Sequence, residues 1–382
     1  MYPTAKVPNT IAGQITPPAD EPGARGRTNG GGSAGAADGS ADGAVEGSTG
    51  GDSGAAPGGP GSAPARRSRP WRTPAEALLT TADGVRIHAE HRPRRPAASA
   101  ASGAAVSGAA VSGDGAEAGE LAVVLVHGFT GSVDRPAVRR AAEVFARSAG
   151  VVTLSMRGHG RSGGTSTVGA REVLDVDAAV RWARALGYRR VATVGFSLGG
   201  AVVVRHAAVC GGVRAVAAVS APARWYYQGT APMRRLHWVV MRPAGRLVGR
   251  LGLKTRIDAV PWPHSTGGGR AMPPHDPIPP VEAAAALGAR ALPLLVVHGD
   301  ADPYFPLDHP RSLAAAYAAG AGAETESETE RQDGGGGREP RAGLWIEPGF
   351  GHAENNAAPE LLERIAAWLT EASQDAAPGG AT

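Results

Sequence analysis

Short, continuous apolar segments alternate along the chain with segments whose apolar residues recur at helical spacing. The continuous segments, which predict strands, are 121–126, 151–154, 191–194, 213–219, 293–297 and 344–346. The helical segments are 137–148, 173–186, 198–209 and 359–370. Strands without alternating polar residues are buried on both faces, and their alternation with helices predicts an α/β fold: a mostly parallel central sheet flanked by helices. Residues 80–92 are expected to add an antiparallel edge.

Three low-complexity stretches interrupt this pattern. Residues 1–70 consist largely of small and polar residues with Pro, which cannot bury enough apolar surface to offset the entropy of ordering. Residues 96–119, with a tandem GAAVS repeat, and residues 324–341, acidic and then Gly-rich, lie between predicted strands and are expected to be loop insertions. We therefore predict a disordered tail over 1–70, one α/β domain over 71–373 and a disordered tail over 374–382.

Charge and cysteine content narrow the function classes. The 39 Lys and Arg residues against 35 Asp and Glu residues leave a net charge of +4, so we expect no nucleic-acid partner. The single cysteine, Cys210, excludes an internal disulfide and a zinc site built on several thiolates, and we expect it to be buried at a helix end. No apolar run approaches the roughly 20 residues of a membrane-spanning helix, and no signal-peptide pattern begins the chain, so a cytoplasmic location is predicted.

The segment GFSLGG, residues 195–200, connects a predicted strand to a predicted helix. Gly-x-Ser-x-Gly in this context is typical of a nucleophile elbow, in which the two glycines leave room for neighbouring backbone around a strained turn. Ser197 would then project above the sheet at the N-terminus of a helix. The alternative is an ordinary strand-to-helix turn with a capping serine. The strand before the turn and the long helix after it favour Ser197 as a nucleophile.

A second glycine-rich turn, HGFTG at residues 127–131, also follows a predicted strand. In this arrangement the backbone N–H groups of Phe129 and Leu198 would together stabilise a carbonyl oxygen as it becomes negative. The alternative is an ordinary loop. The imidazole of His127 has no part in such a site, so we expect it only to hydrogen-bond backbone.

A serine hydroxyl needs a base to become a strong nucleophile. His352 follows the last predicted strand, in a loop with a small residue on each side, and we assign it as the base. We expect the other histidines near strand ends to be structural or surface groups: His88, His91, His159 and His298.

The base in turn needs a carboxylate that orients it. Asp300 and Asp302 both follow the predicted strand 293–297. Asp302 lies on the loop that leaves the sheet, whereas Asp300 is closer to the strand and is placed to cap the turn. The chain order Ser197, Asp302, His352 is the order found in α/β-hydrolases.

With these residues, the sequence resembles the α/β-hydrolase superfamily, and within it the serine hydrolases that include monoacylglycerol lipases, lysophospholipases and serine aminopeptidase-like enzymes. The resemblance covers about residues 75–372 and rests on the segments 127–131, 157–162, 195–200, 299–306 and 351–352. It implies that the acid is the third residue after Gly299, which is Asp302, and that Phe129 and Leu198 are the oxyanion donors. It also implies a helical cap before the acid-bearing strand, at about residues 221–290.

The expected cap is strongly basic. Arg242, Arg246, Arg250 and Lys254 recur every four residues and would form one stripe on a helix. The aromatic residues beside them that we expect to face a substrate are Trp225, Tyr226 and Trp238. One interpretation is a lid that contacts anionic lipid or an acidic substrate, and the other is a solvated helix face in an arginine-rich chain.

We therefore predict a serine hydrolase that cleaves carboxylic esters, including lipid-like, monoacylglycerol or lysophospholipid esters, through an acyl-enzyme and with no cofactor or metal. Its partner is a small-molecule ester. Amide hydrolysis and acyl transfer are alternatives on the same three residues. A different class of alternative is a non-catalytic hydrolase-fold protein that binds a small molecule. The oligomeric state has no signal in the sequence.

Overall fold

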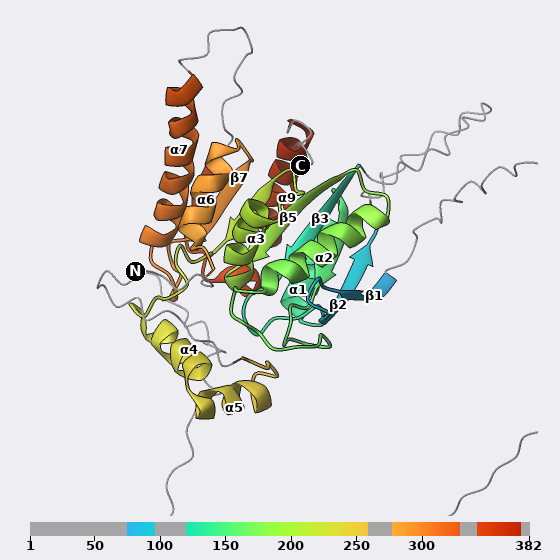
Figure 1. Ribbon diagram of the computed structural model, residues 1–382, viewed down its shortest axis with the longest axis vertical. Helices are drawn as coiled ribbons and strands as arrows, with labels where there is room; N and C mark the ends of the chain where they lie inside the picture. Colours follow the sequence, from blue (N-terminus) through green and yellow to red (C-terminus); the bar gives the residue numbers. More distant parts are fainter. Residues whose placement is uncertain (1–74, 96–119, 259–276, 329–341, 376–382) are drawn as a thin grey trace, which may run out of the picture. The chain divides into compact units, whose positions relative to one another are not determined.

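The computed structural model describes residues 75–95, 120–258, 277–328 and 342–375 (Figure 1). All of them lie within one compact unit of the chain, residues 68–382. The expected tail 1–70 and insertion 96–119 lie outside the described residues, as does the expected start of order at Trp71.

The core of the fold is an eight-stranded sheet in the order β1-β2-β4-β3-β5-β6-β7-β8. Strand β2 is antiparallel to both of its neighbours, and the remaining pairs are parallel. The strands are β1 (Ala75–Thr80), β2 (Arg86–Arg92), β3 (Leu121–Val126), β4 (Gly150–Leu154), β5 (Arg190–Phe196), β6 (Val216–Val219), β7 (Leu294–Gly299) and β8 (Ala342–Glu347). The mostly parallel sheet with an antiparallel edge that the sequence predicts is therefore confirmed.

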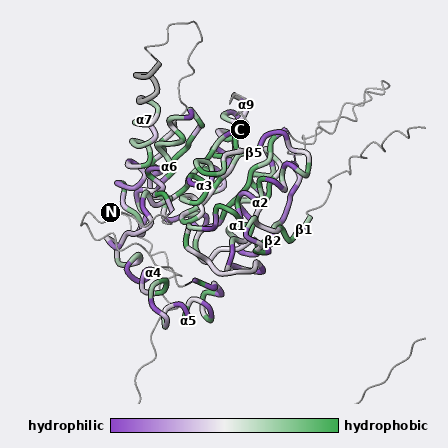
Figure 2. The backbone as a smooth tube through the Cα atoms, viewed as in Figure 1, coloured by the Kyte–Doolittle hydropathy of each residue, from purple (hydrophilic) through white to green (hydrophobic). Residues whose placement is uncertain are grey.

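Helices cover both faces of the sheet, which explains why its strands are continuously apolar. Helices α2 (Glu172–Ala185), α3 (Leu198–Val209), α6 (Pro280–Ala289) and α7 (Asp308–Glu328) pack on one face. Helices α1 (Pro136–Phe145) and α9 (Pro359–Asp375) pack on the other. Successive strand residues serve opposite layers: Val124 packs with α2 and α3, whereas Val123 packs with α1 and α9. Figure 2 colours the same backbone by hydropathy, with hydrophobic residues in green.

Two expected irregular stretches are partly helical. Helix α7 continues to Glu328, into the stretch expected as a loop insertion over 324–341, because its acidic segment contains Glu, a good helix former. Helix α9 continues to Asp375, past the expected start of a tail at residue 374, because Ala372 and Ser373 are buried and fix its last turns.

The cap is smaller than expected. Helices α4 (Ala231–Met241) and α5 (Pro243–Leu251) form it, but α6, which was expected to be part of the cap, belongs to the main core. Ala283 and Leu287 are fully buried. Gly288 lies so close to α7 that a Cβ there would be 2.0 Å from the backbone oxygen of Tyr317, so small residues let the two helices approach closely. The short helix α8 (Ala353–Asn356) precedes α9.

The expected stripe of four basic residues on one helix is wrong. Arg242 has extended backbone and separates α4 from α5, because Pro243 can begin a helix but cannot continue one. Lys254 lies beyond the end of α5, with a φ of 53°. Only Arg246 and Arg250 are on α5 itself. Among the described residues, none of the helices is long and apolar enough to cross a membrane.

Candidate active site

Ser197 lies at the sharp turn between β5 and α3, with φ 51° and ψ −116°. A positive φ is strained for a serine, and the surrounding close packing maintains it. A Cβ at Gly195 would be 2.2 Å from the carbonyl oxygen of Gly199, and a Cβ at Gly199 would be 2.5 Å from that of His127. Both glycines are therefore required by the turn, as the sequence predicted for a nucleophile elbow.

Three side chains form a continuous hydrogen-bonded chain at this turn. The Oγ of Ser197 is 2.8 Å from Nε2 of His352, and Nδ1 of His352 is 2.7 Å from Oδ2 of Asp302. The Asp302 side chain is 0% exposed. Its other oxygen, Oδ1, accepts hydrogen bonds from the backbone N–H groups of Tyr304 and Phe305 at 2.8 and 3.2 Å. The carboxylate is thus fixed from one side and orients the imidazole from the other.

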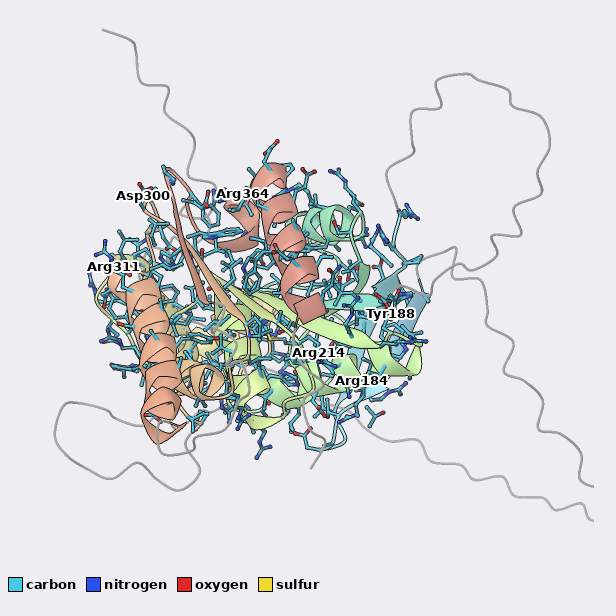
Figure 3. All side chains as sticks on the ribbon, turned by 90° about the horizontal axis from the view of Figure 1, so that it is seen from above. Arg184, Tyr188, Arg214, Asp300, Arg311 and Arg364 are labelled. Carbon is cyan, nitrogen blue, oxygen red and sulfur yellow. The ribbon has the colours of Figure 1, made fainter. Side chains whose placement is uncertain are left out.

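Asp300, the competing carboxylate, does not reach the imidazole. It is exposed on the turn after β7, and its Oδ1 accepts a hydrogen bond from the backbone N–H of Gly349 at 2.7 Å (Figure 3). Gly349 has a φ of 67°, in the left-handed region that favours glycine, and begins the turn that leads to His352. The role expected for Asp300, capping a turn, therefore agrees with its contacts.

The loop that carries His352 is held by several contacts. The imidazole lies against the rings of Tyr304 and Phe305, with centroids 4.4 and 5.7 Å away. The backbone N–H of Ala353 donates to Oγ of Ser220 at 3.1 Å, and Ala353 itself has a φ of 55°. The small residue after the histidine lets this tight loop form, so the imidazole is pre-positioned over Ser197.

The turn after β3 lies directly beside Ser197. A Cβ at Gly128 would be 3.4 Å from Cβ of Ser197. Leu198 is the first residue of α3, where backbone N–H groups have no partner within the helix. These positions agree with the oxyanion role expected for the backbone N–H groups of Phe129 and Leu198, which remains a prediction.

His127 is structural, as expected. Its Nε2 accepts a hydrogen bond from the backbone N–H of Met156 at 3.0 Å, so Nδ1 carries the proton and donates to the carbonyl oxygen of Gly128 at 2.7 Å. Complete burial lowers the pKa of His127 to about 3. The neutral ring therefore ties the turn after β3 to the strand end of β4.

Glu354 is a residue of the site that the sequence analysis missed. Its Oε1 accepts a hydrogen bond from the backbone N–H of Gly128 at 3.1 Å, and burial raises its pKa. It follows His352 closely along the chain, so it connects the histidine loop to the turn that holds Phe129. The only signal in the sequence is its proximity to the histidine, which is too weak to assign a partner in the turn after β3.

The other candidate histidines do not reach Ser197. Nε2 of His298 lies 2.9 Å from the carbonyl oxygen of Phe305 and 3.5 Å from Oδ2 of Asp302. His159 is buried, with its Nδ1 2.9 Å from the carbonyl oxygen of Arg157. His91 bonds the hydroxyl of Tyr188, and His88 lies 3.7 Å from a carboxylate on β1.

The aromatic residues expected to line a substrate site differ in their surroundings. Trp225 packs over Gly169 and donates from Nε1 to the carbonyl oxygen of Ile278 at 3.0 Å, so it braces the cap. Tyr226 makes an edge-to-face contact with the ring of His237, with centroids 4.7 Å apart. Trp238, in contrast, is 48% exposed on α4.

Basic and apolar side chains share the surface of the cap. Leu247 and Leu251 of α5 are 57% and 72% exposed. Arg242 and Arg250 are exposed, as is Lys254, whereas Arg246 is half-buried and donates to the carbonyl oxygen of Met241.

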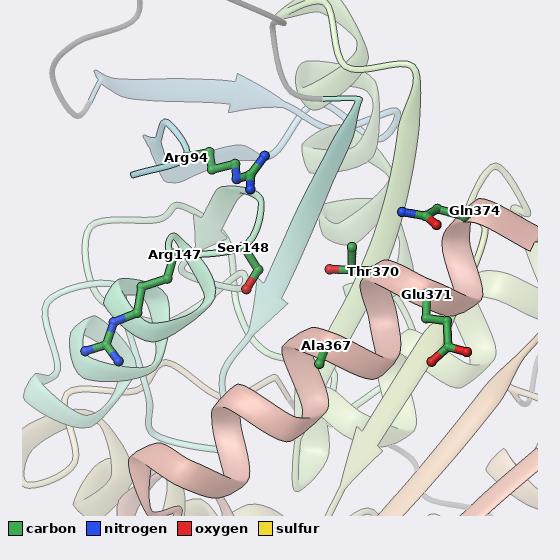
Figure 4. Close-up of a pocket in the computed structure, with 7 residues that line it drawn as sticks. All are labelled: Arg94, Arg147, Ser148, Ala367, Thr370, Glu371 and Gln374. Carbon is green, nitrogen blue, oxygen red and sulfur yellow. The ribbon is translucent and has the colours of Figure 1, made fainter. Parts of the chain in front are cut away.

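A pocket of about 370 Å³ lies elsewhere, between the ends of α1 and α9 (Figure 4). Arg94, Arg147 and Thr370 are among its lining residues, and none of Ser197, Asp302 and His352 is. It is therefore not the substrate site of the arrangement around Ser197.

Comparison with known proteins agrees with this topology. Residues 122–242 match the family model of the alpha/beta hydrolase fold. The esterase Pf2001 of Pyrococcus furiosus has a similar structure, with 17% identity over 79% of this chain and 90% of that chain and a TM-score of 0.51. Est1E of Butyrivibrio proteoclasticus has 17% identity over 79% of this chain and 100% of that chain, with a TM-score of 0.44. No curated protein matches the sequence. At 17% identity the likeness to Pf2001 concerns the fold, not the substrate.

Proposed function

Because the chain has the α/β-hydrolase fold, with a serine, an imidazole and a buried carboxylate in hydrogen-bond contact at its nucleophile turn, we propose that it is a serine hydrolase of carboxylic esters. The observation that carries this proposal is the Ser197–His352–Asp302 chain, with contacts of 2.8 and 2.7 Å. These are the distances that proton transfer between a nucleophile and its base requires.

Each group then has a defined role. The imidazole of His352 takes the proton of Ser197 as Oγ attacks the ester carbonyl carbon, and Asp302 stabilises the imidazolium. The backbone N–H groups of Phe129 and Leu198 stabilise the oxyanion. His352 returns the proton to the leaving alcohol, which leaves an acyl group on Ser197. A water molecule, deprotonated by the same imidazole, releases the acid and restores the hydroxyl.

The strain at Ser197 favours catalysis over simple ligand binding. A residue in a sparsely populated backbone region costs about 1–3 kcal/mol. A protein that only bound a small molecule would gain nothing from holding Ser197 at a φ of 51° in contact with an imidazole. Amide hydrolysis and acyl transfer to an alcohol proceed through the same acyl-enzyme and are alternatives on the same residues. An amide changes the first half of the reaction, in which an amine leaves, and acyl transfer changes the second half, in which an alcohol takes the place of water.

Covalent labelling tests the proposal directly. A fluorophosphonate probe should label the protein once, on the peptide that contains Ser197, and Ser197→Ala should abolish the label. A series of p-nitrophenyl esters of graded chain length should then give turnover and identify the preferred acyl group. A wild-type protein that takes no label and cleaves no ester would be a binding protein, and the proposal would be wrong.

We further propose that the cap surface of α4 and α5 favours anionic substrates or an anionic lipid surface. Exposed Trp238 and Leu251 lie in the same cap as the exposed cations Arg242, Arg250 and Lys254. Apolar side chains enter an interface, and each nearby cation adds about 1 kcal/mol of attraction to an anionic surface.

Charge removal tests the cap. The triple replacement of Arg242, Arg250 and Lys254 by Gln should raise KM for an anionic lysophosphatidyl ester and leave kcat on a short neutral ester unchanged. The matched control removes the same charge at the exposed residues Arg86, Arg171 and Arg189. The effect should shrink with salt, because the Debye length falls from about 30 Å at 0.01 M to about 10 Å at 0.1 M. Equal KM values for the two triple variants would show that the cap is only a solvated surface.

A further inference from the structure

Three side chains with metal-binding atoms meet between α2 and α3, at the end of α3 remote from Ser197. Asp177 belongs to α2, His206 to the last turn of α3, and Cys210 caps that helix. The three ligand atoms all lie within 4.8 Å of one another. His206 and Cys210 are four residues apart on α3, so they share one face of the helix, and Asp177 faces them from its neighbour.

His206 is the unusual member of this cluster. Its side chain is 0% exposed, yet neither ring nitrogen has a hydrogen-bond partner. Its Nε2 lies 3.9 Å from Oδ1 of Asp177, which is too far for a hydrogen bond. A buried polar group without a partner is costly and rare in native proteins. Two ligands of one tetrahedral zinc ion would be about 3.4 Å apart, so the pair is near the separation that a shared ion produces.

Asp177 and Cys210, the other two members of the cluster, are also placed to bind a metal ion. Arg181 holds Oδ2 of Asp177, which orients the carboxylate and leaves Oδ1 directed to His206. Such contacts to the far side of a ligand are typical of metal sites. Cys210 is exposed, contrary to the expectation that it would be buried, so an ion has a path from solvent.

We propose that Asp177, His206 and Cys210 bind one zinc-like divalent cation, with a water molecule from solvent as the fourth ligand. A thiolate, an imidazole and a carboxylate form a borderline-soft ligand set that suits Zn²⁺, whereas Mg²⁺ and Ca²⁺ prefer oxygen ligands alone. The ion would connect α2 to α3.

The site would stabilise the fold and leave the chemistry at Ser197 unaffected. Cys210 lies just past the C-terminus of α3, which rises about 1.5 Å per residue from its start beside Ser197. The inference therefore does not depend on the proposed hydrolase activity. The sequence gives no signal for it, because Asp177 and His206 come from separate helices.

Cobalt binding tests the ligand set in the full-length chain. After treatment with a chelator and removal of the chelator, titration with Co²⁺ should give one bound ion per chain and a thiolate-to-cobalt charge-transfer band, and Zn²⁺ should displace it. Cys210→Ser should abolish the band. Asp177→Asn should weaken binding by about tenfold or more, a loss of the size seen when metal sites are perturbed. The matched control is Asp134→Asn, an exposed carboxylate that also contacts arginine side chains but is not part of the three-residue cluster.

Thermal unfolding gives a second readout that does not depend on colour. An ion that binds only the folded state raises the midpoint of unfolding. Zn²⁺ should raise it in the parent and in Asp134→Asn but not in Cys210→Ser, whose midpoint without metal should equal that of the parent. A cobalt complex without a thiolate band, or a zinc-induced shift that survives in Cys210→Ser, would place the metal elsewhere and overturn the inference.

Discussion

Replacing Asp302 by Asn changes one atom of the proposed triad and preserves its shape. Oδ1 of Asp302 accepts two backbone hydrogen bonds, so the amide oxygen of an asparagine must take that position. The amide NH₂ group then faces Nδ1 of His352, where Oδ2 now lies at 2.7 Å. Because an NH₂ group can only donate, Nδ1 must become an acceptor and the ring proton must move to Nε2.

The consequence falls on the nucleophile. With its proton on Nε2, His352 points a donor at Oγ of Ser197 and can no longer accept the serine proton. In serine protease triads the same change lowers kcat by about 10⁴-fold. A loss of that size corresponds to about 5 kcal/mol of transition-state stabilisation. Since the two side chains have the same shape, the midpoint of thermal unfolding should change little.

The assay is kcat on a soluble p-nitrophenyl ester, with Asp300→Asn as the matched control. Asp300 accepts one hydrogen bond from Gly349, and the amide oxygen of an asparagine can accept it too, so kcat should remain within a few fold of the parent. If Asp302→Asn kept kcat within tenfold of the parent, or if Asp300→Asn lost more activity than Asp302→Asn, the tautomer argument would be refuted.

Three further predictions follow from the site, the tail and the ion pairs. Ser197→Ala should lower kcat by roughly 10⁶-fold, as in other serine triads, and should still fold; substantial residual esterase activity would contradict the nucleophile assignment. Deletion of residues 1–70, which hold none of the site groups, should leave kcat/KM and the unfolding midpoint unchanged; a drop in either would show that this segment contacts the domain. The hydrogen bond from Arg157 lowers the pKa of Asp83 from its usual 3.8 to about 2, so ionised Asp83 stabilises the fold above pH 3.8 and this contribution is lost as the pH falls through about 2. Asp83→Asn should therefore lower the unfolding midpoint at pH 7 but hardly at pH 2, and an equal decrease at both pH values would contradict this.

The sequence predicted the sheet, and it pointed to the three side chains that the structure brings into contact, because these signals are local. Each strand is continuously apolar, and each site residue lies at a strand end, where parallel strands bring loops to one edge of the sheet. The choice of Asp302 over Asp300 was harder, since the two differ by a single turn. It depends on which carboxylate lies where the backbone N–H groups of Tyr304 and Phe305 can donate to it. In the structure this carboxylate is Asp302.

Contacts between distant segments could not be predicted in this way. The hydrogen bond from Gly128 to Glu354 joins two loops that are far apart in the chain, and neither residue type indicates the other. Cys210 was expected to be buried because it closes an apolar helix, but the helix ends at the surface and leaves the thiol exposed. The Gly128–Glu354 hydrogen bond and the exposure of Cys210 both depend on where a strand or helix ends relative to the elements packed around it.

The basic cap shows that periodic spacing alone does not predict a helical stripe. The backbone must also be able to form one continuous helix through all the spaced residues. Four cations at four-residue spacing predict one stripe only if a single helix carries all of them. Pro243 cannot donate the hydrogen bond that would continue α4, so the chain starts a new helix there and Arg242 becomes the junction. Lys254 then follows the helix end near Gly252, with left-handed backbone. The charges still lie on one small cap, so the proposed attraction to an anionic surface does not require the stripe: it would act through a cluster of exposed cations and not through an ordered helical face.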